Sequence, residues 1–468
     1  MVEYNILSPK NIEANKRLDA EYYRTEYLQL EEKLDKHKNV RLNKIAKITD
    51  GDHDRRDYTA NGILFLRSQD IFEYGIIVKE PVYISDTTAK KLSRSKPDDG
   101  DILMTKTGSV GTTIVFNTKY IHNANIPADI SRIKITDPEI NPYFFSMYAN
   151  TNTGRKFIYR LMSGSGRPRI TLNNIKNIKI PILNTIYQEQ IEQASKALYE
   201  YYYKSMKMLE NEIDRINSGY QTSLYNARYE TQKIPIQYIA FNHRIDAEFY
   251  NRSYIDILTQ IKKNNFAKLI YFVDVIKPNF DPSKCPDQNF KYVELSDIDP
   301  KLGLINNSTE MLGCDLPSRA KRVLKENDII ISSVGGSLDK VAIVDKGNDG
   351  SIASNGFIQL RPVKINPEVL LLLAKSIVLQ SQLKRYSTGT ILASVNCNVI
   401  KNFIIPTFSP EENNRMSDYI KKSHYLRNKA IHLLEIIKHS LDIAIEEDES
   451  KAIEYLLREK DKIGGSNE

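Results

Sequence analysis

The sequence repeats itself over most of its length. The segment Arg17–Tyr23 (RLDAEYY) recurs as Arg244–Tyr250 (RIDAEFY), which is an offset of 246 − 19 = 227. Further on, Ile175–Ile178 (IKNI) recurs as Ile400–Phe403 (IKNF), an offset of 401 − 176 = 225, so two residues are lost in a loop. Self-similarity at one spacing indicates two copies of a single structural plan. A chain of this kind is expected to have two similar sites or one pseudo-symmetric surface.

Composition narrows the class of protein. At 468 residues and 41% apolar residues, the chain can form about three units, each with its own core. Its apolar runs are all shorter than the roughly 18 to 20 residues that cross a bilayer, and Met1–Asn5 does not resemble the start of a signal peptide. The expected location is therefore the cytoplasm, with no membrane partner. A net charge of +7 permits nucleic-acid binding without requiring it.

Each copy shows the same order of elements. Asp19 and Asp246 are predicted to cap a first helix, in which apolar residues recur on one face. Short β-branched runs bounded by Gly, Asp and Asn then predict strands, as at 62–66 and 132–135 in the first copy and at 291–295 and 341–344 in the second. These runs predict an α+β fold with a mixed or mainly antiparallel sheet in each copy.

A long helix is predicted to close each copy. From Tyr202 to Tyr220 the apolar residues recur in steps of four and three, and from Tyr419 to Ala444 a similar seam is broken only by Ser440. Each helix could pack on its own domain, because one amphipathic stripe does not identify its partner. We favour an antiparallel pair that forms a spacer between the domains. The expected division is a first domain at 1–185, a first spacer helix at 186–227, a second domain at 228–408, a second spacer helix at 409–446, and a tail at 447–468 with a short helix.

Motifs for catalysis are not evident. Neither a phosphate-binding Gly-x-x-x-x-Gly-Lys-Ser/Thr loop nor a His-Glu-x-x-His metal motif is present, and Ser163–Arg169 lacks the third glycine of a dinucleotide-binding loop. Cys285, Cys314 and Cys397 are too scattered for a metal knuckle or a disulfide framework. The segment Lys277–Phe280 is best interpreted as a coincidental match to a methyltransferase loop. We therefore expect neither a cofactor nor a metal in this chain.

The candidate DNA contacts lie in loops at matched positions of the two copies. One pair is a glycine-containing loop, which is also explained by a simple β-turn. The second pair is a Ser/Thr-Gly loop, where arginines can contact phosphates and glycine allows close approach. A third, mixed-charge loop is as consistent with a solvated surface as with guanine recognition. The candidate residues are Lys106, Thr107, Ser109, Ser333, Ser337 and Lys340 in the first pair, Arg160, Arg167, Arg169, Arg385 and Thr390 in the second, and Arg55 and Arg56 in the third.

The order of these motifs resembles the specificity subunit of type I restriction-modification systems. The resemblance rests on RLDAEYY at 17–23, on Gln69–Ile71 (QDI), on Gly100–Leu103 (GDIL) leading to a Gly-Ser-x-Gly loop, and on Asn-Ile-x-Ile-Pro running into Gln188–Gln190 (QEQ), all duplicated. In the second copy this last tripeptide has become Asn413–Arg415 (NNR), so a shared role of those polar residues is in doubt.

The resemblance implies a non-catalytic DNA-recognition subunit for defence against phage. Two target-recognition domains would each read half of a split, asymmetric sequence in double-stranded DNA, and the helices would set the gap. Two methyltransferase subunits carrying S-adenosylmethionine would modify adenine, and restriction subunits using ATP and Mg would cut unmodified DNA. Two other classes stay open, namely a coiled-coil adaptor without DNA preference and a self-contained methyltransferase or nuclease.

Overall fold

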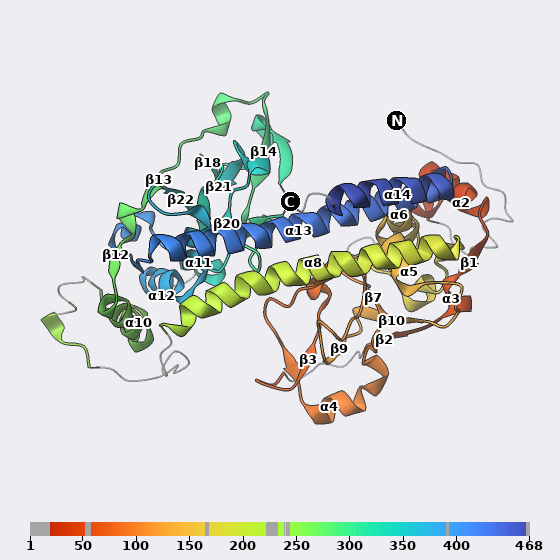
Figure 1. Ribbon diagram of the computed structural model, residues 1–468, viewed down its shortest axis with the longest axis horizontal. Coiled ribbons are helices and arrows are strands. Elements are labelled where there is room, and N and C mark those ends of the chain that lie inside the picture. Colours follow the sequence, from red (N-terminus) through yellow and green to blue (C-terminus); the bar gives the residue numbers. More distant parts are fainter. Residues whose placement is uncertain are drawn as a thin grey trace. The chain divides into compact units, whose positions relative to one another are not determined.

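The computed structural model describes residues 19–51, 58–163, 168–220, 233–237, 239, 244–306, 308–389 and 393–464 (Figure 1). The chain divides into two compact units, of which unit 1 comprises 1–203 with 426–468 and unit 2 comprises 204–425. Each long helix therefore contributes one part to each unit. Within the described ranges, no helix combines the length and the hydropathy that crossing a membrane requires.

Unit 1 is built on a four-stranded antiparallel sheet in the order β2-β10-β7-β8. A smaller sheet, β6-β3-β9, contains one parallel pair, in which Leu64 lies opposite Ala124. Helix α5 begins at Pro142, whose fixed φ suits a first helical position, and is capped by Asn141. The elements of the body are η1 (Ala20–Tyr23), α2 (Thr25–Asp35), β1 (Asn39–Arg41), α3 (Leu42–Ile45), β2 (Ala46–Asp50), β3 (Ile63–Phe65), η2 (Ser68–Asp70), β4 (Ile71–Phe72), β5 (Gly75–Ile76), β6 (Tyr83–Ile84), α4 (Asp86–Lys91), η3 (Ser93–Ser95), β7 (Ile102–Thr105), β8 (Thr113–Val115), β9 (Ala124–Asn125), β10 (Ile130–Ile135), α5 (Pro142–Asn150), α6 (Asn152–Arg160), α7 (Leu172–Ile175) and β11 (Lys179–Pro181).

Unit 2 repeats this architecture. Its main sheet has the order β13-β22-β19-β20, and its second sheet, β17-β14-β21-β18, again has one parallel pair. Its elements are η4 (Ala247–Tyr250), α10 (Arg252–Lys263), β12 (Phe266–Lys268), η5 (Leu269–Tyr271), β13 (Val273–Ile276), η6 (Pro282–Lys284), β14 (Asn289–Val293), η7 (Leu295–Asp297), β15 (Ile298–Asp299), β16 (Leu304–Ile305), β17 (Thr309–Leu312), η8 (Gly313–Asp315), β18 (Ala320–Val323), β19 (Ile329–Ser332), η9 (Gly335–Ser337), β20 (Val341–Ile343), η10 (Lys346–Asn348), β21 (Ile352–Ser354), β22 (Phe357–Pro362), α11 (Pro367–Lys375), α12 (Ile377–Tyr386), η11 (Cys397–Asn402) and β23 (Ile404–Pro406). The α+β class and the duplication predicted from sequence are confirmed.

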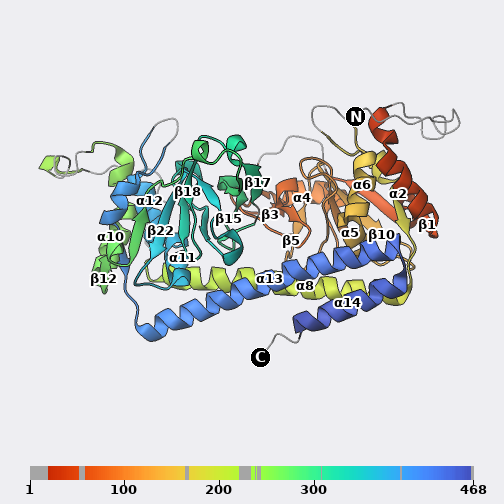
Figure 2. The ribbon, with the colours of Figure 1, turned by 90° about the horizontal axis from the view of Figure 1, so that it is seen from above.

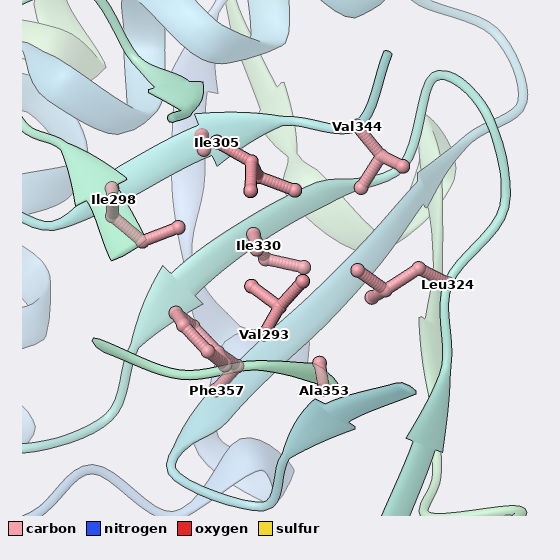
Figure 3. Close-up of a cluster of buried hydrophobic side chains, with 9 residues drawn as sticks. Val293, Ile298, Ile305, Leu324, Ile330, Val344, Ala353 and Phe357 are labelled. Carbon is pink, nitrogen blue, oxygen red and sulfur yellow. The ribbon is translucent and has the colours of Figure 1, made fainter. Parts of the chain in front are cut away.

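The second unit has a continuous apolar core between its sheets. Nine side chains, including Val293, Ile330 and Phe357, form one cluster in which every member is at most 4% exposed (Figure 3). Burial of apolar surface on this scale is the main force that stabilises such a body. Three members of the cluster, Val293, Ala342 and Val344, lie in the runs at 291–295 and 341–344 for which the sequence predicted strands.

The first helix of each copy differs from its prediction. Ala20–Tyr23 is a single 3-10 turn that Asp19 does not cap, Arg24 is extended, and α2 starts only at Thr25. In the second copy Asp246 does cap, because its carboxylate accepts a hydrogen bond from the Phe249 N–H at 3.3 Å. The break lets the paired aromatic residues of the turn pack inward independently of the helix that follows.

The two long helices are antiparallel neighbours within each unit. They are α8 (Thr185–Ser218) and α13 (Pro410–Glu446) (Figures 1 and 2). In unit 1 the Tyr187 hydroxyl bonds to the Ser440 hydroxyl at 2.7 Å, and in unit 2 the Ser423 hydroxyl donates to the Ser205 carbonyl at 2.7 Å. Ser440, which breaks the apolar seam, is therefore fully buried as a polar contact. The predicted antiparallel pairing is observed in both units.

An ion pair joins the same two helices in unit 2. Arg415 makes two hydrogen bonds of 2.9 Å to the carboxylate of Glu212, a bidentate geometry. Burial would raise the pKa of Glu212, but Arg415 and Arg215 outweigh that effect and lower the pKa. The tail, for which a short helix was predicted, forms the 16-residue helix α14 (Glu449–Gly464). Ser440 also donates to the Ala452 carbonyl of α14 at 2.9 Å.

Candidate nucleic-acid interface

Within each unit, the predicted glycine-containing loop lies beside the predicted Ser/Thr-Gly loop. In unit 1 the Lys106 N–H donates to the Asp129 carbonyl at 2.7 Å, and the Ile170 N–H donates to the Lys106 carbonyl at 3.2 Å. Unit 2 repeats this pattern, because the Ser333 N–H donates to Gly356 and the Val395 N–H donates to Ser333, both at 2.8 Å. Main-chain bonds therefore hold the β7–β8 loop against the Ser/Thr-Gly loop, and the β19–β20 loop has the matching contact.

Glycine has different roles in the β7–β8 loop of unit 1 and the β19–β20 loop of unit 2. Gly108 has φ +71°, so the turn predicted from the sequence is present in unit 1. Gly335 instead allows a close approach, because a Cβ there would lie 2.8 Å from the Cβ of Ala393. The loops share a position but not a backbone conformation.

A basic group lies beside the β7–β8 loop. The Lys106 ammonium is 3.1 Å from the buried Asp50 carboxylate, and the Arg94 guanidinium is 3.4 Å from the same group. The side chain of Lys106 is 13% exposed, whereas that of Arg94 is 72% exposed. Arg94, which the sequence reasoning missed, is therefore better placed than Lys106 to reach a phosphate.

A pocket of about 580 Å³ opens between the β7–β8 loop and the turn η2. Its wall combines two aromatic rings with amide, guanidinium, hydroxyl and carboxylate groups. Thr107 and Ser109 were predicted as site residues, and the pocket brings them together with residues that were not. The lining residues are Tyr58, Phe65, Arg67, Ser68, Gln69, Thr107, Gly108, Ser109, Pro127 and Asp129.

The turn η2 is held by a buried carboxylate. Asp70 is 1% exposed and accepts a hydrogen bond from the Arg67 N–H at 2.8 Å. Burial raises the pKa of Asp70 despite this hydrogen bond. The Ser68 hydroxyl also donates to the Asp129 carbonyl at 3.2 Å, whereas Gln69 is exposed. The sequence signal was the repeated Asp-Ile pair, which marks the turn but not the pocket beside it.

The prediction that Arg160 contacts DNA is wrong, because its side chain is used inside unit 1. It is 3% exposed, donates to the Tyr22 carbonyl at 2.9 Å and lies 2.6 Å from the Glu31 carboxylate. Its guanidinium also lies over the Tyr22 ring, 4.2 Å from the centroid. Burial would raise the pKa of Glu31, but hydrogen bonds from Arg160 and Lys179 lower it.

Arg385, which is half-buried, makes similar contacts in unit 2, and its contact with DNA stays a prediction. Its guanidinium donates to the Phe249 carbonyl at 3.0 Å and lies 4.2 Å from the Phe249 ring centroid. The two arginines therefore clamp the first turn of each unit, which the repeat places at matching positions. An arginine in a loop near glycine fits either role, and only the fold separates them.

The remaining candidates have varied surroundings. Arg169 is exposed and pairs with Ser163 as an isolated antiparallel bridge, while Arg55, Arg56, Arg167 and Thr390 lie outside the described residues. In unit 2 the polar groups bond within the protein. The Ser333 hydroxyl donates to the Gly356 carbonyl at 2.8 Å, the Ser337 hydroxyl bonds to that of Ser332 at 2.9 Å, and the Lys340 ammonium donates to the Leu295 carbonyl at 2.8 Å.

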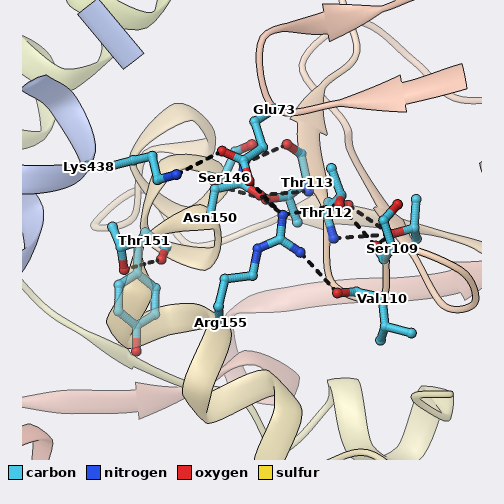
Figure 4. A network of polar contacts seen from close by, with 12 residues as sticks. Glu73, Ser109, Val110, Thr112, Thr113, Ser146, Asn150, Thr151, Arg155 and Lys438 are labelled. Atoms are coloured by element: carbon cyan, nitrogen blue, oxygen red, sulfur yellow. Dashed lines mark hydrogen bonds and ion pairs between the residues drawn. The ribbon is translucent and has the colours of Figure 1, made fainter. Parts of the chain in front are cut away.

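An arginine fixes the far side of the β7–β8 loop. Arg155 donates to the Val110 carbonyl at 2.9 Å and to the Glu73 carboxylate at 2.8 Å, and Glu73 also pairs with Lys438 of α13 at 3.2 Å (Figure 4). The chain of contacts runs from α13 through Glu73 to the loop. Such a network holds the loop in one geometry, as a recognition site requires.

Among the side chains that the structure describes, no group of three or more His, Cys, Asp or Glu residues could hold a metal ion. The geometry defines a duplicated α+β protein in which each unit holds two loops side by side.

Comparison with known proteins finds similarity to one family in part of the chain. Residues 303–435 match the family described as the type I restriction modification DNA specificity domain. A curated relative, the type I restriction enzyme EcoBI specificity subunit of Escherichia coli, is 24% identical over 171 residues, which are 36% of this chain and 36% of the relative. Residues 303–435 are therefore similar to a type I restriction modification DNA specificity domain, in agreement with the resemblance seen in the sequence. The alignment spans only about a third of the relative's length.

Solved structures with related descriptions align over most of the chain. The type I restriction-modification S subunit from M. genitalium is 13% identical with a TM-score of 0.39, covering 87% of this chain and 95% of that one. The HsdS subunit from Thermoanaerobacter tengcongensis is 15% identical with a TM-score of 0.29, covering 88% and 97%. Scores this low add nothing to the assignment, which rests on the domain match.

Proposed function

We propose that this chain is the DNA-binding specificity subunit of a type I restriction-modification complex. Each unit reads one half of a bipartite, asymmetric site in double-stranded DNA, and the α8–α13 pair sets the gap between the half-sites. The observation that carries the proposal is the duplicated scaffold, because the specificity-domain match at 303–435 falls on one copy and the same strand order recurs in the other.

The reaction belongs to partner subunits. Two methyltransferase subunits bind the two pseudo-equivalent helical surfaces and supply S-adenosylmethionine, and restriction subunits supply ATP and Mg. The chain itself catalyses no step, and the complex acts in the cytoplasm. A two-copy scaffold supports this stoichiometry because each copy offers a similar surface to an identical partner.

The two half-sites are expected to be unlike. At matching places of the two turns, unit 1 has Arg67 and unit 2 has Glu294, so a donor is replaced by an acceptor. Base edges in the major groove differ in their donors and acceptors, so the two units would favour different bases.

The test is to express the chain with the methyltransferase subunit of the same system and to sequence the host DNA for modified adenines. A split motif with a fixed gap, dependent on both chains, is the expected result. An unbroken motif would contradict the two-domain reading. Absence of modification with a partner of demonstrated activity would contradict DNA recognition and favour the coiled-coil adaptor.

Salt dependence provides a second measurement on the purified complex. Contacts between Arg or Lys and phosphates release counterions, so DNA affinity is expected to fall steeply between about 50 and 200 mM salt. An affinity that does not respond to salt would contradict a phosphate-contacting interface.

A further inference from the structure

One side of the pocket in unit 1 is formed by a turn at 67–70 whose backbone is held by hydrogen bonds. The backbone of the turn at 67–70 is closed by two bonds of 2.8 Å, from the Arg67 N–H to the Asp70 carboxylate and from the Asp70 N–H to the Arg67 carbonyl. The Ile77 N–H donates to the Asp70 carbonyl at 2.8 Å, which ties the turn to the residue that follows β5. Side chains on such a turn have fixed starting points.

Unit 2 builds the same turn from other side chains. The Glu294 N–H donates to the Asp297 carboxylate at 2.8 Å, as in unit 1, and the Asp297 N–H donates to the Glu294 carbonyl at 3.1 Å. The three residues before the aspartate are Arg-Ser-Gln in unit 1 and Glu-Leu-Ser in unit 2. The two turns share the same backbone hydrogen bonds but carry different side chains.

The neighbours of the turn are also distinct. The Arg67 guanidinium donates to the Glu80 carbonyl at 2.7 Å, which places it along the pocket wall. Glu294 instead pairs with Arg319 at 2.7 Å and accepts from the Ser296 hydroxyl at 2.8 Å. Each unit thus orders its own set of donors and acceptors around one backbone turn.

Gln69 has the chemistry of a base reader. It lines the pocket, is exposed, and carries an amide that can donate and accept at once. An amide of this kind pairs bidentately with the N6 and N7 edge of adenine. Thr107 and Ser109 on the facing loop add hydroxyl groups, and Asp70 keeps the turn fixed beneath them.

We propose that the turn at 67–69 is the specificity-determining element of unit 1, with Gln69 bound to the edge of an adenine in the first half-site. The matched turn at 294–296 serves unit 2 for the second half-site. This inference rests on the proposed function and names the residues that carry its specificity.

The experiment uses the complex of the full chain with its methyltransferase subunit and a library of duplexes in which the first half-site is randomised. Methylation by wild type is compared with that by Gln69→Ala, Gln69→Glu and, as a matched control, Gln29→Ala, an exposed amide on α2. Gln69→Ala is expected to reduce discrimination for adenine at one position about 10- to 100-fold, because one bidentate pair is lost. The second half-site and the gap are expected to stay unchanged.

Gln69→Glu separates a reading role from a structural one. A carboxylate accepts but cannot donate, so preference at that position is expected to move from adenine toward cytosine, whose N4 amino group donates. A switch of this kind would not follow from a misfolded turn. The same discrimination in all variants would overturn the inference, and so would an equal loss at every position, which is typical of a phosphate contact.

A change in each turn tests whether the two turns act on separate half-sites. Replacing Arg67-Ser68-Gln69 by Glu-Leu-Ser is expected to alter the first half-site only, and Ser296→Ala is expected to alter the second half-site only. Effects in the opposite half-site would overturn the inference. If the wild-type complex itself recognised no bipartite motif, the proposed function would fail instead, so the two failures are distinguishable.

Discussion

Arg155 in unit 1 and Gln380 in unit 2 occupy matching positions, 225 residues apart, and perform one task with different chemistry. Arg155 donates to the Val110 carbonyl at 2.9 Å, and Gln380 donates to the Leu338 carbonyl at 3.0 Å. Arg155 also pairs with Glu73, which in turn pairs with Lys438 of α13. Both units therefore keep a contact to the loop after β7 or β19, although the residue that makes the contact differs.

Replacing Arg160 in unit 1 and Arg385 in unit 2 is expected to have the largest effect on the stability of the two units. Arg160→Ala is expected to destabilise unit 1 by about 3 kcal/mol, because the buried guanidinium loses its ion pair with Glu31, its hydrogen bond to the Tyr22 carbonyl and its contact with the Tyr22 ring, while Glu31 keeps Lys179. Arg385→Ala is expected to cost about 1 to 2 kcal/mol in unit 2, because the half-buried guanidinium loses its hydrogen bond to the Phe249 carbonyl and its contact with the Phe249 ring. Hydrogen exchange of peptides 20–35 and 247–263 measures each unit separately. Equal protection in both variants would contradict the ranking.

The substitution Arg155→Gln gives unit 1 the residue type that unit 2 has at the matching position, Gln380. The loop contact can persist through the amide, but the ion pair with Glu73 is lost, so we expect destabilisation of about 1 to 2 kcal/mol. Denaturation in urea measures the free energy change. Lys438→Met should be less damaging than Arg155→Gln, because Arg155 would still neutralise Glu73, and the reverse order would contradict this account.

The helix pair is expected to respond to pH in unit 2 more than in unit 1. The folded-state pKa of Glu212 lies below its ordinary value of 4.5, so its pairing with Arg415 stabilises the fold above that pH and is lost as the pH falls through the folded pKa. The effect is about 1 kcal/mol. Hydrogen exchange of 204–218 between pH 6 and pH 3 measures it. Glu212→Gln should abolish the dependence, and a dependence that remains would assign it to another group.

The hydroxyl pair in unit 1 gives the smallest effect. Tyr187→Phe is expected to destabilise the helix pair there by about 1 kcal/mol, because Ser440 keeps its bond to the Ala452 carbonyl but loses the tyrosine hydroxyl. Thermal unfolding measures the shift, with Tyr159→Phe, an exposed tyrosine on α6, as the control. A larger loss in the control would contradict the assignment.

The features that could be predicted from the sequence are those that follow from the spacing of apolar residues and from the internal repeat. The repeat, the sheets and the seam around Leu209 and Leu433 follow from spacing and apolar content, and both leucines are at most 2% exposed. The break at Arg24 was missed because the helical periodicity continues through it. The role of Arg160 was missed because a guanidinium suits a phosphate, a carboxylate and an aromatic ring equally well. The motif at Gln69–Ile71 was recognised in the sequence, but the pocket that Gln69 lines was not, because the pocket is formed by residues far apart in the chain.

The constant register of the two long helices has a consequence for how length can change. Tyr187 meets Ser440 in unit 1, and Glu212 meets Arg415 in unit 2, so 25 residues separate the contacts on each helix. An insertion in one helix alone would put these contacts out of step. Seven residues added to both would lengthen the pair by about 10.5 Å and nearly restore each side chain's direction, whereas four would add about 6 Å and rotate it by about 40°. Viable changes in spacing should therefore come in discrete, paired increments.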